Sequence, residues 1–358
     1  MKKNNSGGGI LGGIILFIIG IGLLWWNEGR TAKEISLLKE VKAKYVQLDS
    51  AKVVATNEKK IVATNGKLDL TNSADLVDTE FAVSVHSAKL ERKVEMYQWV
   101  EECNEEDDTK NCTYKKEWSS DLIDSSTFYQ SGHSNPTSKL FEDSTLLADN
   151  VKVGDFNIPK ELIDKLSAEE SVRDLSNEVA ERKQLKVSTS GDYFTNTKDE
   201  VNPQIGDVRI RFYKNNATDV SVLAVQTGDT FSAYTAKNGK SLMVIREGNQ
   251  TGAQIIQSLF DANNFMKWLF RFIGFMLVSG GIASLFSFLT TITSRIPILG
   301  SIVGGAVGLV SFILGLIISF VVCAIAWFRF RPIISICLLV IAAILFVILK
   351  FVIKKKES

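Results

Sequence analysis

The sequence predicts an α+β fold in which four transmembrane helices, one N-terminal and three C-terminal, flank a large β-rich extracytoplasmic domain carrying helical insertions. Two observations lead to this prediction. Long apolar runs lie only near the two ends of the chain, whereas the middle alternates apolar and polar residues between turn signals. An uncharged apolar run of about 18 residues or more is long enough to cross a hydrocarbon core of about 30 Å.

The first predicted span covers residues 8–26, which read GGILGGIILFIIGIGLLWW after a short basic tail over 1–7. A secretory signal peptide is the alternative, because it also has a basic start followed by an apolar stretch. Trp25 and Trp26 occupy the place where small cleavage-site residues would stand. As interfacial aromatic residues they favour an uncleaved anchor.

The other three spans are predicted over residues 268–293, 298–327 and 333–353, with a basic tail over 354–358. Their connectors contain Arg and Pro, residues at which a membrane helix can stop. Lys2, Lys3, Lys350 and Lys354–Lys356, with Arg295, favour a cytoplasmic position for both tails. The domain over 27–267 would then be extracytoplasmic or lumenal, although Arg329 and Arg331 argue against this orientation.

The domain begins with a helical composition over residues 31–45, which predicts a stalk that continues the first span. Strands follow, and Asn65-Gly66 and Asn238-Gly239 each predict a hairpin turn. A helical region predicted over 159–185 separates two sheet-like halves. The simplest arrangement is a mostly antiparallel sheet with helical insertions. The hairpin around Asn65-Gly66 is predicted over residues 60–70, and the further predicted strands are residues 81–85, 90–100, 114–119, 192–195, 208–213, 220–226, 231–236 and 242–246.

Cys103 and Cys112 lie in this domain on either side of a predicted polar loop, Asn104–Asn111. A disulfide between them would suit an oxidising compartment. Two free thiols near a hairpin are the alternative. An acidic cluster lies in and next to this loop: Glu101, Glu102, Glu105, Glu106, Asp107 and Asp108. Such a cluster is typical of a solvated surface. Calcium binding is the alternative, but the residue spacing of an EF-hand loop is missing.

Composition excludes several classes of function. The 41 Lys and Arg residues nearly balance the 40 Asp and Glu residues, so we expect no nucleic-acid partner. The two histidines form no HExxH motif, and GxSxG, CxxC and P-loop motifs are missing, so we expect neither a catalytic residue nor a metal or other cofactor. His133 in Gly-His-Ser-Asn-Pro is interpreted as a turn residue, with a general base as the alternative.

Ionisable residues lie at the ends of the predicted spans and in their connectors rather than in the span centres, which argues against a transporter or channel. The spans do contain glycines at four-residue spacing, at Gly300, Gly304 and Gly308 and at Gly8 and Gly12. Such a stripe lets two helices approach closely. It predicts either oligomerisation or packing between spans of one chain.

Trp99 and Trp118 lie on adjacent predicted strands next to the cysteine pair, close to Tyr97. Packing within the domain explains them, since aromatic residues often form cross-strand pairs. A surface for a protein partner is the alternative, because Trp and Tyr are enriched at interaction hot spots.

Several motifs in collinear order make the chain resemble the transmembrane protein 43 (LUMA) family. The most unusual is the run Met96-Tyr-Gln-Trp-Val-Glu101. The motifs are Asn27–Arg30, Lys89–Glu101, Glu117-Trp118, Gly132–Pro136, Gly191–Phe194, Ile205–Arg209 and Trp327–Pro332.

The resemblance implies a homo-oligomer that organises complexes with other membrane or envelope proteins, such as emerin and lamins in eukaryotes. It implies the endoplasmic reticulum or inner nuclear membrane if the source is eukaryotic, and the cell membrane if it is bacterial. The Lys- and Asn-rich start and compact tails favour a bacterial member, for which emerin and lamins could not be partners. We therefore expect a multi-pass, non-enzymatic membrane scaffold in contact with lipids. An enzyme of undetected type and a channel or lipid-handling protein are the alternatives.

Overall fold

The computed structural model describes residues 6–106, 109–293, 297–328 and 332–357 of the chain. They form two compact units, one of membrane-length helices and one rich in strands. Four helices among the described residues are long and apolar enough to cross a membrane: Leu11–Lys44, Gly252–Phe286, Val307–Trp327 and Pro332–Lys350. The predicted fold class, with one such helix near the N-terminus and three near the C-terminus, is confirmed.

The helical unit contains α1 (Ser6–Lys44), α4 (Gly252–Thr293), α5 (Pro297–Trp327) and α6 (Pro332–Glu357). All four helices are longer than the predicted spans, and α1 and α4 are much longer. Helix α1 continues without a break through the predicted stalk, and α4 begins well before residue 268. Helices α5 and α6 each begin at a proline, which is tolerated in the first turn because its missing N–H would have no intrahelical partner there. The connectors with Arg295, Arg329 and Arg331 lie outside the described residues.

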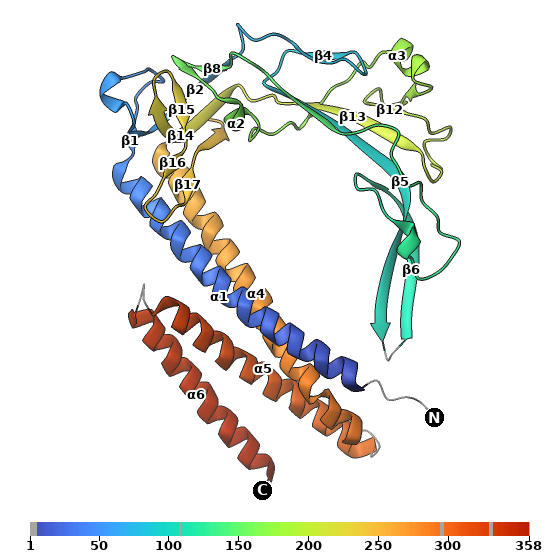
Figure 1. Cartoon of the computed structure of the whole chain (residues 1–358), viewed down its shortest axis with the longest axis vertical. Coiled ribbons are helices and arrows are strands. Elements are labelled where there is room, and N and C mark those ends of the chain that lie inside the picture. The colour runs from blue at the N-terminus through green and yellow to red at the C-terminus, as the bar shows by residue number, and fades with distance from the viewer. Residues whose placement is uncertain (1–5, 107–108, 294–296, 329–331, 358) are drawn as a thin grey trace. The chain divides into compact units, whose positions relative to one another are not determined.

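Helices α1 and α4 run side by side in opposite directions (Figure 1). Glycines allow their backbones to approach. A Cβ atom built on Gly13 would lie 3.0 Å from the carbonyl oxygen of Gly281, and one on Gly20 would lie 3.1 Å from that of Gly274. Leu24 packs beside these contacts against Val278, Ile282 and Cys323, forming the buried core of the helical unit.

A small hairpin of β16 (Tyr234–Thr235) and β17 (Ser241–Leu242) packs on α1. Its turn is the predicted Asn238-Gly239, where Gly239 has φ of +80°. The Asn238 side-chain amide donates to the carbonyl oxygen of Lys33 at 2.7 Å. The turn therefore fixes the hairpin to the part of α1 that was predicted as a stalk.

The β-rich unit contains two seven-stranded sheets. In the first, β2, β8, β9, β15 and β14 pair in a closed circuit, since β2 also pairs with β14, while β1 and β18 extend it. Most described pairings are antiparallel, with β1–β2 and β9–β15 parallel. Its strands are β1 (Val46–Gln47), β2 (Ile61–Asp69), β8 (Lys152–Val153), β9 (Phe156–Asn157), β14 (Asp219–Thr227), β15 (Thr230–Ser232) and β18 (Val244–Glu247).

The second sheet follows the order β11-β12-β13-β5-β6, with β10 on β13 and β7 on β5. Buried Phe81, Phe194 and Phe212 form the centre of an aromatic cluster in the core of the unit. The strands are β5 (Lys89–Glu106), β6 (Thr109–Ser119), β7 (Ser144–Leu147), β10 (Glu170–Ser171), β11 (Lys186–Val187), β12 (Tyr193–Thr195) and β13 (Val208–Lys214); β3 (Leu76–Asp78) and β4 (Val83–Val85) pair separately.

Three sequence predictions for this unit are wrong in part. The two sheets do not follow the two halves of the chain, because each takes strands from both sides of residues 159–185. That region contains only the short helices α2 (Lys160–Ile163) and α3 (Asn177–Arg182), with β10 between them. Asn65-Gly66 is no hairpin turn, because β2 runs straight through it and pairs there with Ser221 and Val220 of β14.

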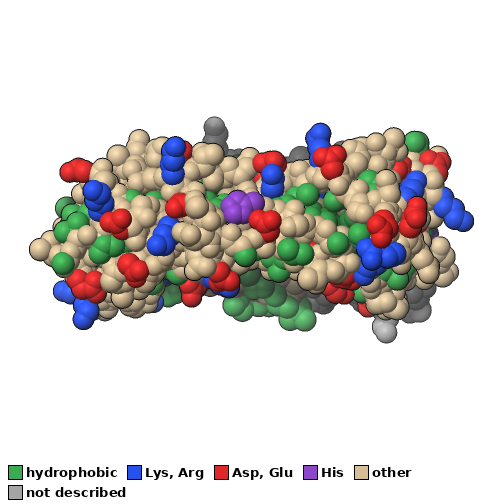
Figure 2. Space-filling model, turned by 90° about the horizontal axis from the view of Figure 1, so that it is seen from above, with side chains coloured by type: hydrophobic (Ala, Val, Ile, Leu, Met, Phe, Trp, Pro, Cys, Tyr) green, Lys and Arg blue, Asp and Glu red, His purple; other side chains and the backbone are tan. Residues whose placement is uncertain are grey.

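A physical reason for the strand through Gly66 is close packing. A Cβ atom at this position would lie 3.1 Å from a methyl carbon of Val153. Glycine therefore serves close approach of strands here rather than a positive φ. On the outer face of the β-rich unit, basic and acidic side chains are interspersed (Figure 2), which is the usual arrangement for a solvated surface.

Candidate functional site

The end of strand β5 leaves the second sheet as a two-stranded ribbon with β6 (Figure 1). Strand β13 pairs with Leu90–Met96, and β6 pairs with Met96–Glu106. Among the described strands, β5 beyond Met96 therefore pairs with β6 alone. Because an isolated two-stranded hairpin is at best marginally stable in water, this ribbon needs additional bracing.

One brace is covalent. Cys103 and Cys112 lie opposite each other in the ribbon and form a disulfide, with Cα atoms 4.0 Å apart. The prediction of a polar loop over Asn104–Asn111 is wrong in extent, since β5 continues to Glu106 and β6 starts at Thr109. Cross-strand pairing, including Glu105 with Lys110, favours strand here. Asp107 and Asp108 lie outside the described residues.

The second brace is the segment 121–135, which runs along the free edge of β5. Asn135 bonds the backbone of Trp99 twice, accepting from its N–H at 2.7 Å and donating to its carbonyl oxygen at 2.9 Å. Fully buried Gln98 accepts from the N–H of Ile123 at 2.9 Å and donates to the carbonyl oxygen of Asp121 at 2.8 Å. Two side-chain amides thus replace the missing neighbouring strand.

The predicted aromatic candidates meet on the ribbon. The rings of Tyr97 and Trp118 lie opposite each other with centroids 5.3 Å apart, and the guanidinium of Arg209 lies 4.5 Å from the Trp118 ring. Trp99 contacts the ring of His133 edge to face at 4.6 Å, with the ammonium of Lys116 4.8 Å from its own ring. All three candidates are half-buried and lie outside the hydrophobic core.

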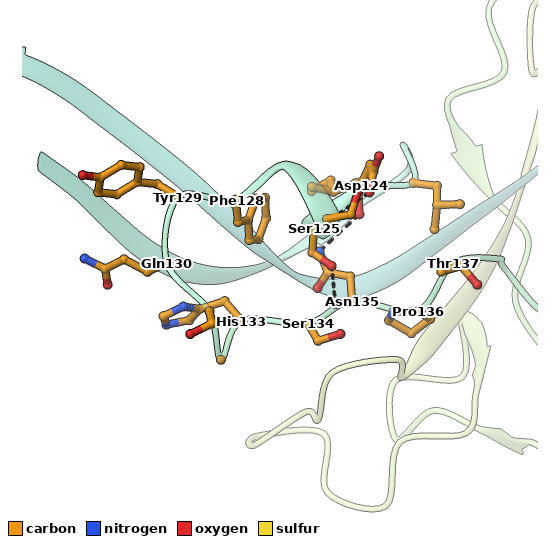
Figure 3. Close-up of a pocket in the computed structure, with 15 residues that line it drawn as sticks. Asp124, Ser125, Phe128, Tyr129, Gln130, His133, Ser134, Asn135, Pro136 and Thr137 are labelled. Carbon is orange, nitrogen blue, oxygen red and sulfur yellow. Dashed lines mark hydrogen bonds between the residues drawn. The ribbon is translucent and has the colours of Figure 1, made fainter. Parts of the chain in front are cut away.

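The segment over the ribbon also encloses a hollow of 810 Å³ lined by residues 122–137 (Figure 3). His133, the alternative general base, stacks on Tyr114 with ring centroids 3.8 Å apart and does not face Asp124 or Ser125 (Figure 3). Asp124 accepts from the N–H of Ser126, and Ser125 from that of Asn135. Among the described residues of this hollow, no nucleophile bonds to a base.

Carboxylates near the disulfide are engaged by the protein itself. Glu101 accepts from the hydroxyl of Tyr114 at 2.6 Å and from the N–H of Tyr129 at 2.5 Å. Burial and the hydrogen bond to Glu101 raise the pKa of Tyr114, so its hydroxyl stays protonated as a donor. Glu101 lies close to both cysteine sulfurs, but sulfurs bonded to each other are not thiolate ligands for a metal. Glu102 pairs with Lys115, and the side chains of Glu105 and Glu106 are outside the described residues.

The glycine candidates divide into two groups. A Cβ atom at Gly12 or Gly308 would meet no atom of the described residues within 4 Å, so these two positions face away from the part of the chain that the structure describes. The close contacts between membrane-length helices involve Gly13, Gly20, Gly274, Gly281 and Gly315, most of which the sequence pattern missed. The surroundings of Gly8, Gly300 and Gly304 lie outside the described residues.

A buried ion pair in the helical unit was not predicted. Glu28 on α1 is 1% exposed. Its Oε1 accepts from Nε of Arg271 at 2.6 Å and from the thiol of Cys323 at 3.3 Å. Its Oε2 accepts from Nη2 of Arg271 at 2.9 Å and from the indole N–H of Trp327. Four donors match the roughly four acceptor positions of a carboxylate.

This cluster joins α1, α4 and α5 at one level, next to Trp25, Trp26 and Trp268, which are 55%, 52% and 59% exposed. Exposed tryptophans at the end of membrane helices typically mark the membrane interface. The signal in the sequence was the polar run Asn27-Glu-Gly-Arg30 directly after an apolar span. Asn27 also donates to the carbonyl oxygen of Lys267 at 3.0 Å, and Arg30 to Asn263 at 3.1 Å.

The chain has four membrane-length helices, three of which are joined by the buried Glu28 cluster, and a β-rich domain with a disulfide-braced ribbon. These features define an integral multi-pass membrane protein. The chain belongs to the transmembrane protein 43 family, whose model matches residues 96–332. This range begins at the root of the ribbon and ends at the first residue of α6.

Curated relatives support the same assignment along most of the chain. Transmembrane protein 43 of Rattus norvegicus is 28% identical over 350 residues, covering 92% of this chain and 86% of the relative. That of Homo sapiens is 27% identical with the same coverage. The transmembrane protein 43 homolog of Drosophila melanogaster is 27% identical over 352 residues and is itself covered to 91%. No solved structure matches the chain.

Proposed function

We propose that this protein is a non-enzymatic membrane scaffold that self-associates through its spans and holds other membrane or envelope proteins through the β5–β6 ribbon. The observation that carries this proposal is the bracing of the ribbon by a disulfide and by two buried amides. The bracing stabilises the ribbon and also holds its exposed side chains in one fixed arrangement, although the described ribbon residues beyond Met96 lie outside the core cluster. A rigid surface lowers the entropy lost when a partner binds.

The chemistry of the ribbon fits a protein partner. Tyr97, Trp99 and Trp118 are half-buried, and Arg209 and Lys116 lie over the two indole rings. Trp, Tyr and Arg are the residue types that dominate binding energy at protein interfaces. The 810 Å³ hollow beside them shows no paired nucleophile and base among its described residues, which favours binding over catalysis.

Outward-facing glycines support self-association. Cβ atoms at Gly308 on α5 and Gly12 on α1 would contact no other described part of their own chain, whereas the close helix pairs use other glycines. Small residues on the outer face of a membrane helix allow the backbone of a second helix to approach. A second copy of α5 is the partner we propose for Gly308.

Orientation and membrane form part of the same proposal. A disulfide in the β-rich domain fits an oxidising compartment, and the basic tails fit the cytoplasm. Both termini would then be cytoplasmic. The membrane would be the cell membrane in a bacterium, and the endoplasmic reticulum or inner nuclear membrane in a eukaryote.

The ribbon is tested by photo-crosslinking in cells with a benzophenone amino acid at Lys116. An exposed position elsewhere in the domain, Asp149, serves as the matched control. We expect a discrete adduct with a membrane protein from position 116 only, and its loss when Trp118→Ala is added. Equal adducts from both positions, or an adduct that survives Trp118→Ala, would contradict a ribbon-specific surface.

A further inference from the structure

A cavity of 280 Å³ lies within the helical unit beside the Glu28–Arg271 pair. Residues of α1, α4, α5 and α6 line it, and most of them are apolar, including Leu24, Phe275, Leu316 and Leu338. Its volume is at the lower end of the range for ligand sites, about 300–1,000 Å³. The cavity is thus of a size for one hydrocarbon chain rather than for a whole two-chain lipid.

The cavity lies among the apolar membrane-length helices, and an exposed tryptophan, Trp268, forms part of its lining. Trp268 and Phe272 belong to its lining, and each is 59% exposed on the outer surface of the helical unit. A cavity with such residues is accessible from the surrounding lipid. Its natural occupant is the hydrocarbon chain of a membrane lipid.

One polar atom inside the cavity has no partner. Ser319 on α5 lines the cavity and is 7% exposed, and its hydroxyl makes no hydrogen bond among the described residues. A buried polar group without a partner is costly, so an occupant that offers an acceptor there would be favoured. A plain hydrocarbon chain does not supply one, but the ester carbonyl at the head of an acyl chain does.

The position of Ser319 fits this acceptor. It precedes Cys323, which bonds Glu28, by one helical turn, about 6 Å along the helix axis. A phosphate at the level of Arg271 would therefore be followed, a few covalent bonds deeper, by an ester carbonyl at the level of Ser319. The chain beyond the carbonyl would continue into the apolar part of the cavity.

Charge at the entrance favours an anionic headgroup. Arg271 lines the cavity, Lys267 lies one helical turn before it on α4, and Arg30 bonds Asn263, one turn before Lys267. With Glu28 as the negative charge, these four side chains carry a net charge of +2. The pair with Glu28 uses Nε and Nη2 of Arg271, so Nη1 is outside that pair. Arginine binds phosphate through several parallel N–H donors.

We propose that this cavity binds one acyl chain of an anionic phospholipid, with its phosphate at Arg271 and Lys267 and its ester carbonyl on the Ser319 hydroxyl. This proposal is independent of the scaffold function. The bound lipid would fill the gap between the helices and give Ser319 its missing partner.

The test is native mass spectrometry of the full-length protein in mild detergent. The probes are phosphatidylglycerol, phosphatidylcholine with the same acyl chains, and oleate. We expect one tightly held phosphatidylglycerol per chain, with weaker retention of the other two. Leu316→Trp, which fills the cavity, should abolish retention, whereas Leu309→Trp, one heptad away and 51% exposed, should not.

A second pair of variants leaves the cavity open. Ser319→Ala should weaken retention about three- to tenfold, the effect of one hydrogen bond. Ser311 is another buried serine of α5 whose hydroxyl has no hydrogen-bond partner among the described residues, and Ser311→Ala should leave retention unchanged. Equal retention of phosphatidylglycerol in wild type and both cavity variants would overturn the proposal. Equal retention of oleate or phosphatidylcholine would overturn the headgroup assignment.

Discussion

Replacing Glu28 by Gln should destabilise the helical unit more than any substitution of a surface charge. The carboxylate is 1% exposed and accepts four hydrogen bonds from three side chains. Two of these hydrogen bonds come from the guanidinium of Arg271. Removing one member of a buried ion pair leaves the other charge uncompensated, which typically costs about 3–5 kcal/mol. We expect Glu28→Gln to lower the free energy of unfolding by an amount in this range.

A double-mutant cycle separates the pair from its individual members. Because Glu28→Gln leaves Arg271 unpaired, adding Arg271→Gln should cost far less than it does in the wild type. The sum of the two single-mutant losses in unfolding free energy should therefore exceed the loss in the double mutant by about 2 kcal/mol or more.

The assay is reversible unfolding in mixed micelles with increasing sodium dodecyl sulfate, followed by circular dichroism of the helices. Glu34→Gln on the same helix is the control, because Glu34 forms only a surface ion pair. Its Oε2 lies 3.5 Å from Nζ of Lys240, and the side chains of Glu34 and Lys240 are 24% and 40% exposed. Such a surface pair contributes about 1 kcal/mol or less. A Glu28→Gln variant as stable as Glu34→Gln, or strictly additive costs in the cycle, would refute this reasoning.

Three further predictions concern the β-rich unit. Burial raises the pKa of Glu95, but hydrogen bonds and charge from Arg209 and Arg211 outweigh it and hold the pKa below its usual value. This stabilisation, about 1.5–3 kcal/mol, is present above the unfolded-state pKa and is lost as pH falls through the folded-state pKa. The difference in unfolding free energy between wild type and Glu95→Gln should therefore narrow as pH falls below about 4. A constant difference from pH 7 to pH 3 would contradict this prediction. Gly154→Ala should lower the free energy of unfolding by at least about 3 kcal/mol, because φ is +58° and the new Cβ would lie 2.1 Å from the carbonyl oxygen of Ala51. The control, Gly228→Ala, has φ of +60° and no described atom near the new Cβ, and should lower it by about 1–2 kcal/mol. Equal denaturant midpoints for the two variants would contradict this prediction. Replacing both Cys103 and Cys112 by Ser should speed amide hydrogen exchange in the ribbon but leave β2 and β14 unchanged, at a local cost of about 2–3 kcal/mol; unchanged ribbon exchange would show that the amide contacts alone brace it.

Membrane helices were predictable because length and apolarity are local properties of the sequence. The hairpin turn at Asn238-Gly239 was predictable for the same reason, because the turn preference of this dipeptide is local and Gly239 has the positive φ that such a turn requires. At Asn65-Gly66 the identical dipeptide failed, because pairing with β14 and close packing on Val153 outweigh the turn preference of two residues. Tertiary contacts of this kind are not visible in a short window of sequence.

The candidate site shows the same limit. Tyr97, Trp99 and Trp118 were identifiable by residue type, and the cysteine spacing suggested a bridge. Glu28 and Arg271 are 243 positions apart, and each reads alone as a charge at the end of a span. Asn135, which substitutes for a strand along β5, reads as part of an ordinary Asn-Pro turn. Long-range partners had to come from the fold.

The scaffold account is tested most directly by the mass of the purified protein in mild detergent after chemical crosslinking, compared for wild type, Gly308→Leu and Gly22→Leu. A Cβ atom at either glycine would meet no atom of the described residues within 4 Å, but only Gly308 lies on the third span. The account predicts one defined oligomer for wild type and Gly22→Leu and a monomer for Gly308→Leu. A monomer in all three, or an oligomer that Gly308→Leu leaves intact, would contradict it.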